Sequence, residues 1–198
     1  MVLIPNRDRM SGIKLPIRHM THDEFYHFCQ NNPDFKFERD PDGTILTMTL
    51  TGGTTDRRNT DLTIDLGLWN RSARAGVVFD SSTGFALPNG ADRSPDVAFV
   101  SLDRWNALTS EEQTKLPPLC PDFIIELMSE TDNLREAAGK MQEYIENGCR
   151  LAWLINPKTE EARIYRPDGS VRVIHGFDNA LTGEDVLPGF TFDLRLLR

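Results

Sequence analysis

A strand–helix–strand pattern between residues 122 and 155 restricts the fold of this chain more than any other feature. Phe123–Met128 is an apolar strand interrupted by one glutamate, and Leu151–Ile155 is a second apolar strand. The residues between them predict a long helix, capped by Thr131 or Asp132. Two strands joined through a helix commonly lie parallel in one sheet, so the pattern predicts a mixed α/β domain.

The rest of the chain adds two earlier helices and several short strands to this unit. Residues 1–20 are expected to form an N-terminal arm, and residues 21–198 a single domain. The second helix is expected to be capped by Thr54 or Thr55. The expected helices are His22–Asn31 and Thr54–Ser72, and the expected strands are Phe35–Arg39, Thr44–Leu50, Val77–Asp80, Gly84–Leu87, Asp96–Val100, Ala162–Arg166 and Val171–Ile174.

The net charge of the chain disfavours binding of nucleic acid over a broad part of its surface. Twenty-two Lys and Arg against 30 Asp and Glu give a formal net charge of −8. Proteins that grip nucleic acid over a broad surface usually carry a basic excess, so this kind of binding is disfavoured, although a small local cleft is not. The absence of a Walker loop, a Rossmann fingerprint and a G-x-S-x-G motif disfavours NTPases, dinucleotide enzymes and serine hydrolases.

The cysteines and the hydropathy pattern indicate a reducing compartment. Cys29, Cys120 and Cys149 are odd in number and far apart, so they predict neither a disulfide framework nor a zinc ribbon. The first apolar stretch is too short for a signal peptide, and no later one is long enough to span a membrane. The chain is therefore expected to be a soluble, cytoplasmic protein that makes no membrane contact.

Two acidic side chains stand in otherwise apolar strands and are candidates for chemistry. Asp96 begins one strand, and Glu126 lies inside another. A buried ionised carboxylate is costly unless it is paired, hydrogen-bonded or bound to a metal. If the two strands are neighbours, the two acids form an oxygen-rich site suited to Mg²⁺ or Mn²⁺. Such an ion can activate water for attack on a phosphodiester.

Lys140 adds a positive charge near these acids. It lies at the margin of the apolar face of the helix that follows Glu126, about 40° from Tyr144 around the helix axis. From there its ammonium group can reach the strand that carries Glu126. A lysine in that place can orient an attacking water or neutralise the charge that develops on a phosphate.

Each of these residues also has a structural interpretation. Glu126 could pair with an arginine or a backbone amide, and Asp96 could bond a turn at the start of its strand. Lys140 could be a solvated helix residue. Asp122 shares strand parity with Glu126 but lies at the mouth of the strand, where contact with solvent is expected.

The histidines and arginines of the N-terminal half predict structural roles. Without paired cysteines or an H-E-x-x-H motif, zinc binding is disfavoured for His19, His22 and His27. Four arginines bracket the second helix among several aspartates, which favours an ion-paired, solvated face over phosphate contact. These are Arg57, Arg58, Arg71 and Arg74.

Five short motifs follow one another along most of the chain. They are Phe37–Gly43 (FERDPDG), Ser94–Val97 (SPDV), Pro121–Ser129 (PDFIIELMS), Gly139–Gly148 (GKMQEYIENG) and Trp153–Pro157 (WLINP). In order and spacing they resemble the Uma2 family (DUF820), a branch of the PD-(D/E)xK restriction-endonuclease-like superfamily, over about residues 20–195. The resemblance implies a restriction-endonuclease-like α/β (α+β) fold, in which helices flank a central mixed β-sheet and β-hairpins lie at the periphery.

The resemblance also implies the residues of a nuclease site. Asp96 and Glu126 match the metal-binding acids, with Mg²⁺ or Mn²⁺ as the cofactor, and Lys140 matches the catalytic lysine. Glu38 matches an acid near the first hairpin that can be a third metal ligand or orient water. In most of the superfamily the lysine lies on the strand, at the place where this chain has Met128. As in Uma2 sequences generally, a lysine on the helix takes its place.

The activity that the resemblance implies is metal-dependent hydrolysis of DNA phosphodiester bonds by an endonuclease. An alternative is a catalytically inactive nuclease-fold module that binds nucleic acid or protein, which the missing strand lysine and the acidic composition favour. A third class, a small-molecule phosphodiesterase, requires a closed pocket rather than an open cleft of DNA width. A homodimer is also expected, because the resemblance implies two sites for two strands and because the apolar segment Leu187–Phe192, if exposed, permits one.

Overall fold

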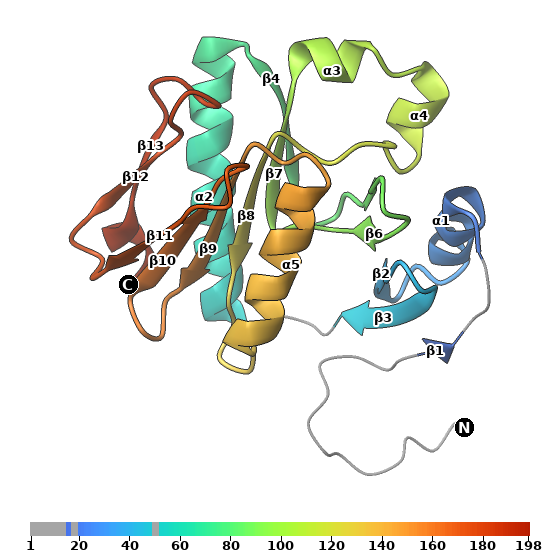
Figure 1. Ribbon diagram of the computed structural model, residues 1–198, viewed down its shortest axis with the longest axis horizontal. Coiled ribbons are helices and arrows are strands. Elements are labelled where there is room, and N and C mark those ends of the chain that lie inside the picture. The colour runs from blue at the N-terminus through green and yellow to red at the C-terminus, as the bar shows by residue number, and fades with distance from the viewer. Residues whose placement is uncertain (1–14, 17–19, 49–51) are drawn as a thin grey trace.

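A six-stranded mixed β-sheet forms the centre of the protein (Figure 1). The computed structural model describes residues 15–16, 20–48 and 52–198. From one edge of the sheet to the other, the strands are β11 (Val171–His175), β10 (Glu161–Tyr165), β9 (Leu151–Asn156), β8 (Phe123–Leu127), β7 (Val97–Ser101) and β4 (Gly76–Asp80). β8 and β9 run parallel, and the helix α5 (Leu134–Glu146) connects them. The predicted strand–helix–strand unit is therefore confirmed.

The central sheet is covered on both faces. The helix α2 (Gly53–Ala73) lies on one face with the C-terminal segment, and α5 lies on the other (Figure 1). In β8, Phe123 and Ile125 pack on the α2 side, whereas Ile124 packs on the α5 side. Since successive side chains of a strand point to opposite faces, Glu126 lies on the α5 side. The apolar run of β8 is therefore the signature of a strand buried on both faces.

A smaller sheet joins the N-terminal hairpin to the segment just before β7. In order, its strands are β1 (Leu15–Pro16), β3 (Thr44–Met48), β2 (Lys36–Arg39), β6 (Asp92–Arg93) and β5 (Phe85–Ala86). β2 pairs with β6 where Arg39 lies opposite Asp92. Because β6 ends shortly before Asp96, this pairing brings the hairpin to the start of β7.

The remaining elements surround the two sheets. Thr21 and Glu24 form a capping box at the start of the first helix. The turn between β2 and β3 ends at Gly43, whose φ of 86° is strained for other residues. The remaining elements are α1 (His22–Gln30), α3 (Leu102–Asn106), α4 (Ser110–Thr114), β12 (Ala180–Thr182), β13 (Thr191–Asp193) and a 3₁₀ helix at Leu194–Leu197.

The predicted elements occur, with ends that mostly shift by one residue. The strand predicted for Thr44–Leu50 is observed as far as Met48, and its last two residues lie outside the described residues, as do residues 1–14 and 17–19 of the expected arm. The sequence pattern does not predict β6, β12 or β13, which are only two or three residues long. Strands of that length are too short to show a period.

The N-terminal caps predicted for the two long helices, α2 and α5, are wrong. α2 begins after Gly52, which has an extended backbone and makes no side-chain cap, so neither Thr54 nor Thr55 caps it. α5 is capped by Asn133, whose side chain accepts a hydrogen bond from the N–H of Arg135. Several polar residues precede each helix, and which one caps it depends on the point where the backbone leaves its extended conformation.

The C-terminal segment belongs to the core, which corrects the expectation that Leu187–Phe192 is an exposed apolar surface. Leu187, Phe190 and Phe192 are buried and pack with the α2 side of the sheet. The ring of Phe190 stacks on Trp153 with 5.8 Å between the centroids. This segment therefore completes the fold of its own chain, and it gives no support to a homodimer.

The described cysteines are free, as predicted, and Cys120 and Cys149 are buried. Among the helices of the described chain, none is long and apolar enough to cross a membrane.

Replacing Phe190 by alanine tests the role of the C-terminal segment. Phe190→Ala removes a stacked ring from the core and should lower the free energy of unfolding by about 3–5 kcal/mol, measured by urea denaturation. Leu196→Ala is the matched control, because Leu196 lies in the same segment but is exposed, and it should cost less than about 1 kcal/mol. Equal, small losses for both variants would contradict the assignment of this segment to the core.

Candidate active site

Asp96 and Glu126 lie at the same end of two neighbouring strands. β7 and β8 pair antiparallel, with Val97 opposite Ile125. Continuing this register by one residue brings Asp96 opposite Glu126. The backbone N–H of Leu127 donates a hydrogen bond of 2.9 Å to Oδ2 of Asp96 and so ties the strands together at this point. The structure thus brings the two predicted acids into one site.

Glu126 faces α5 and is held by two donors from that helix. Its Oε1 lies 2.9 Å from Nζ of Lys140 and accepts a second hydrogen bond of 2.9 Å from the hydroxyl of Tyr144. Burial raises the pKa of Glu126 to about 7, and the neighbouring charges of Asp96 and Glu38 add to this effect, whereas Lys140 opposes it. This carboxyl group therefore exchanges its proton near neutral pH.

The charged form of Asp96 is also disfavoured by its surroundings. Burial raises its pKa, although the hydrogen bond from Leu127 and the charges of Lys140 and Lys36 oppose the effect. The nearby positive charges therefore do not fully compensate the negative charges of the two acids, which lie close together in a partly dehydrated site.

Lys140 joins three elements at the centre of the site. Its Nζ lies 2.9 Å from Oε1 of Glu126 on β8 and 2.9 Å from Oε1 of Glu38 on β2. Burial alone lowers the pKa of this ammonium group, but the two carboxylates outweigh burial, and the pKa lies above its usual value. Lys140 is therefore a charged group held in a fixed position and not a solvated helix residue.

Glu38 is the most deeply buried of these acids, with 3% of its surface exposed. Its Oε1 accepts hydrogen bonds from Lys140 and from the backbone N–H of Ser94, both at 2.9 Å, and its Oε2 lies 3.8 Å from Arg93. Burial tends to raise the pKa of Glu38, but the charges of Lys140 and Arg93 and the bond from Ser94 bring it below its usual value. Glu38 is thus an ionised group that fixes Lys140 and the chain before Asp96.

Two residues of the site do not follow from the sequence argument. Tyr144 bonds Glu126, and its position four residues after Lys140 is the helical spacing that could have indicated this. Lys36 precedes Glu38 by two residues on the same strand, a spacing that places both side chains on one face. Burial lowers the pKa of Lys36, while the nearby charges of Asp96 and Glu38 oppose this.

The fold agrees with comparisons to known proteins. The model of the Uma2 family, described as "Putative restriction endonuclease", matches residues 22–195. The chain belongs to the Uma2 family. A solved structure from Anabaena variabilis, described as "a putative nuclease belonging to DUF820", matches with a TM-score of 0.75 and 16% sequence identity, and the match covers 90% of this chain and 97% of that one. At that identity the likeness concerns the fold, and it confirms the predicted fold class. No curated protein matches the chain.

The donor set of this Uma2 site fits a hard cation that binds few protein ligands. The described residues contain no cluster of three or more His, Cys, Asp or Glu side chains arranged to hold a metal ion. Glu38 is instead engaged with Lys140 and Ser94. In the described part of the chain, no hydrogen bond reaches Oδ1 of Asp96 or Oε2 of Glu126. One free oxygen from each of two acids suits Mg²⁺, which often binds one or two carboxylates and keeps its waters.

The other polar candidates have structural roles. The prediction that Asp122 contacts solvent is wrong, because only 1% of its surface is exposed. It accepts a hydrogen bond from the N–H of Ser101, at the end of β7, and pairs with Arg104 of α3 at 3.1 Å. Arg57 pairs with Asp61 as predicted.

The histidines likewise take structural positions where they are described. His22 contacts Asp92 at 2.5 Å, and His27 lies 3.7 Å from Asp23 on the same helix. His19 falls outside the described residues.

The raised pKa of Glu126 predicts a pH-dependent gain in stability when its charge is removed. Below its ordinary pKa of 4.5 the group is protonated in both the folded and unfolded chains, so it contributes no difference. Between 4.5 and about 7 the unfolded chain releases the proton first, and folding becomes less favourable as the pH rises. Glu126→Gln should therefore raise the free energy of unfolding at pH 8 by about 3 kcal/mol, and this gain should vanish near pH 4.

Urea denaturation at a series of pH values measures this gain. Glu146→Gln serves as the control, because Glu146 is exposed at the end of the same helix and should show no pH-dependent difference. A gain for Glu126→Gln that is equal at pH 4 and pH 8 would contradict a raised pKa.

Proposed function

We propose that this protein is a metal-dependent endonuclease that hydrolyses DNA phosphodiester bonds at the site of Asp96, Glu126, Lys140 and Glu38. The observation that carries this proposal is the position of the Lys140 ammonium group, 2.9 Å from both Glu38 and Glu126 and beside Asp96. Phosphoryl transfer needs stabilisation of the negative charge that develops on the phosphate. A fixed ammonium group next to two carboxylates that can bind a further cation is suited to this chemistry. Membership in the Uma2 family supports the same class of reaction.

Each residue has a defined task in this proposal. Asp96 and Glu126 would hold Mg²⁺ or Mn²⁺ through their free oxygens, and the hydroxyl of Tyr144 keeps Glu126 oriented. The bound ion supplies Lewis-acid stabilisation of the phosphate and makes a water molecule more acidic. Lys140 neutralises the charge that develops on the phosphate, and Glu38 holds Lys140 in place.

The position of Lys140 accounts for the apolar residue on the strand. Met128 belongs to the core on the α5 side and is buried. A lysine at that place would lie among apolar side chains. Lys140 instead extends from α5, on the face of the sheet where Glu126 lies, and its ammonium group is 2.9 Å from Glu126. The absence of a lysine from the strand is therefore no argument against catalysis.

The acidic composition predicts how DNA binds. With a net charge of −8, the surface offers little attraction to phosphates over long distances. DNA affinity should be weak, sensitive to salt and dependent on the metal ion.

Calorimetric titration with Mn²⁺ or Mg²⁺ tests the metal site. The wild type should bind the ion, and Glu126→Ala should abolish the binding heat, because one of the two carboxylate ligands is lost. Glu146→Gln, at an exposed acid on α5, should bind like the wild type. Metal binding that survives Glu126→Ala would place the ion elsewhere.

A nicking assay on supercoiled DNA tests the chemistry. Lys140→Met keeps an unbranched aliphatic side chain but removes the ammonium group, whose Nζ lies 5.8 Å from the centroid of the Tyr144 ring. It should lower the cleavage rate at least about a hundredfold in the presence of Mg²⁺ or Mn²⁺. Equal background cleavage by the wild type and by Lys140→Met would reject the enzyme and favour a binding module of the same fold.

A homodimer stays a prediction. Two copies would supply one site for each strand of a duplex, and light scattering on the purified protein would measure the number of copies.

A further inference from the structure

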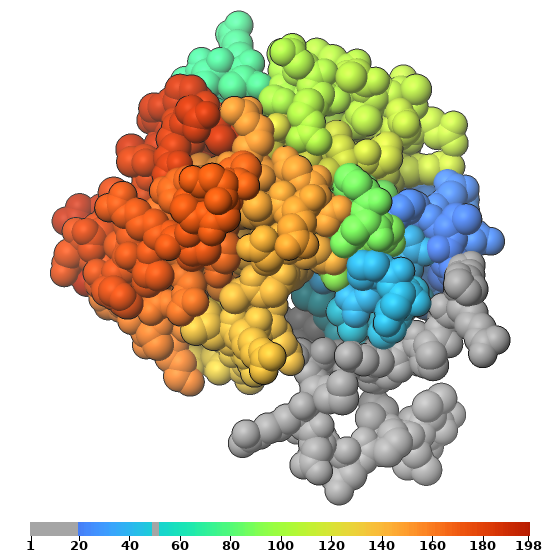
Figure 2. Space-filling view, in the orientation of Figure 1, coloured from blue at the N-terminus to red at the C-terminus, as the bar shows by residue number. Residues whose placement is uncertain are grey.

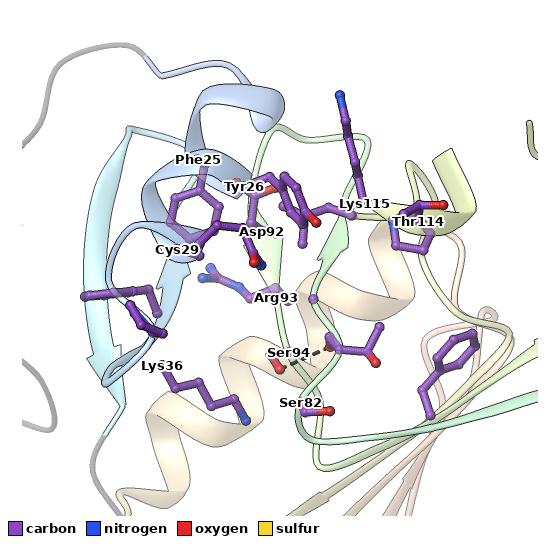
Figure 3. Close-up of a pocket in the computed structure, with 18 of the residues that line it drawn as sticks. Phe25, Tyr26, Cys29, Lys36, Ser82, Asp92, Arg93, Ser94, Thr114 and Lys115 are labelled. Atoms are coloured by element: carbon purple, nitrogen blue, oxygen red, sulfur yellow. Dashed lines mark hydrogen bonds between the residues drawn. The ribbon is translucent and has the colours of Figure 1, made fainter. Parts of the chain in front are cut away.

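A cavity of about 620 Å³ lies between the N-terminal elements and the segments around β5, β6 and α4 (Figure 3). Phe25, Tyr26 and Cys29 reach it from α1, and Thr114 and Lys115 from the end of α4. The other lining residues lie within residues 30–37, 79–94 and 113–117. Its volume falls in the range of sites that hold one small organic molecule. It is too small to admit a double helix.

The cavity adjoins the candidate active site. Ser94 and Lys36 both line it. The N–H of Ser94 bonds Glu38, and the ammonium group of Lys36 acts electrostatically on Asp96 and Glu126. Figure 3 shows Lys36 extending from β2 toward the side of the cavity where Ser82 and Ser94 lie. A strand whose phosphate lies at the acids can therefore place a neighbouring nucleotide in this space.

Aromatic side chains form much of the cavity wall. Phe37 lies in the cavity wall, and its ring is 5.9 Å from that of Phe35. Phe35 is 61% exposed, the most exposed of the large apolar side chains in the described residues. Tyr26 lines the same opening. Exposed rings beside a polar pocket provide stacking surfaces for nucleobases, because every base has a π face.

The basic side chains that line the cavity differ in whether they form ion pairs with acidic side chains. Arg93 bonds Glu143 and Asp40 at 2.6 and 2.7 Å, and Lys115 bonds Asp23 at 2.5 Å. The ammonium group of Lys36 makes no hydrogen bond or close ion pair with another described residue, although Asp96, Glu38 and Glu126 act on it electrostatically. Of the described cavity residues, Lys36 is thus the cation that is available to a phosphate.

We propose that this cavity binds one unpaired nucleotide of the nucleic acid strand next to the scissile phosphate, with its base against Phe35 and its phosphate on Lys36. This proposal rests on the proposed function and specifies its substrate as single-stranded or locally unpaired DNA. Bases in a duplex are stacked on their neighbours and cannot enter a cavity of this size, whereas a free strand presents them without an unpairing cost.

Fluorescence anisotropy in the presence of EDTA and at low salt tests the proposal without cleavage. Removing the metal ion weakens the binding of both probes, but the contacts with Phe35 and Lys36 do not need the ion, so probes and variants are compared under the same conditions. The probes are a short, fluorescein-labelled oligothymidylate and its duplex with oligoadenylate. The single strand should bind at least about tenfold more tightly than the duplex. Phe35→Ala and Lys36→Gln should each weaken binding of the single strand about fivefold to tenfold, with little effect on the duplex.

The controls are Leu68→Ala and Arg172→Gln, an exposed apolar and an exposed basic residue outside the cavity. Both should leave binding of the single strand within about twofold of the wild type. Equal binding of both probes, or an unchanged affinity in Phe35→Ala, would overturn the proposal. Displacement of the strand by an equimolar amount of thymidine monophosphate would overturn it as well, because the cavity would then take free nucleotides.

These outcomes are independent of those of the nicking assay. Metal-dependent nicking without a preference for the single strand rejects the cavity proposal alone. Selective binding of the single strand by a protein that does not cleave DNA rejects the enzyme and retains the nucleotide site.

Discussion

The ion pairs of Lys140 hold together the parts from which the candidate site is built. Glu38 belongs to the small sheet, Glu126 to the central sheet and Lys140 to α5, and the ammonium group bonds both acids. Charges that are removed from water are costly, and removing one partner leaves the others uncompensated. The geometry of the site and the attachment of the N-terminal sheet therefore depend on the same contact. Figure 2 shows this junction from outside, where the β2–β3 hairpin and the β6 segment adjoin α5.

Charge also provides the second connection across this junction. Arg93 on β6 bonds Glu143 of α5 and Asp40 after β2. By contrast, the two large apolar clusters, which pack on the faces of the central sheet, include no residue from the described range 20–48. The N-terminal elements are thus held to the core by ion pairs more than by shared apolar packing. Their position, and with it the shape of the cavity, should respond to pH and salt more than the central sheet does.

The sequence predicts the parts of this arrangement that depend on local pattern. An apolar strand that contains one glutamate, followed by a helix with Lys140 at its margin, indicates a buried acid–lysine pair, and the structure has a Lys140–Glu126 distance of 2.9 Å. It does not predict which polar residue caps α5, because neighbouring residues have equal propensity. Nor does it predict the cavity, because Lys36, Ser94 and Lys115 converge only through the pairing of β2 with β6 and the path of the loop that carries α4. Contacts between distant segments leave no period in the sequence.

The formal net charge of −8 overstates the field that a nucleic acid would meet at this site. It counts Glu38, Asp96 and Glu126 as free anions, although Lys140 neutralises part of their charge and Glu126, with a pKa near 7, is partly protonated at neutral pH. A cation bound by Asp96 and Glu126 would reverse the local charge altogether. Lys36, whose ammonium group makes no hydrogen bond to another described residue, then adds a positive charge that acts on the same acids. An acidic chain can therefore present a locally positive site when the ion is bound, and the proposed reaction needs positive charge at this position for the substrate phosphate.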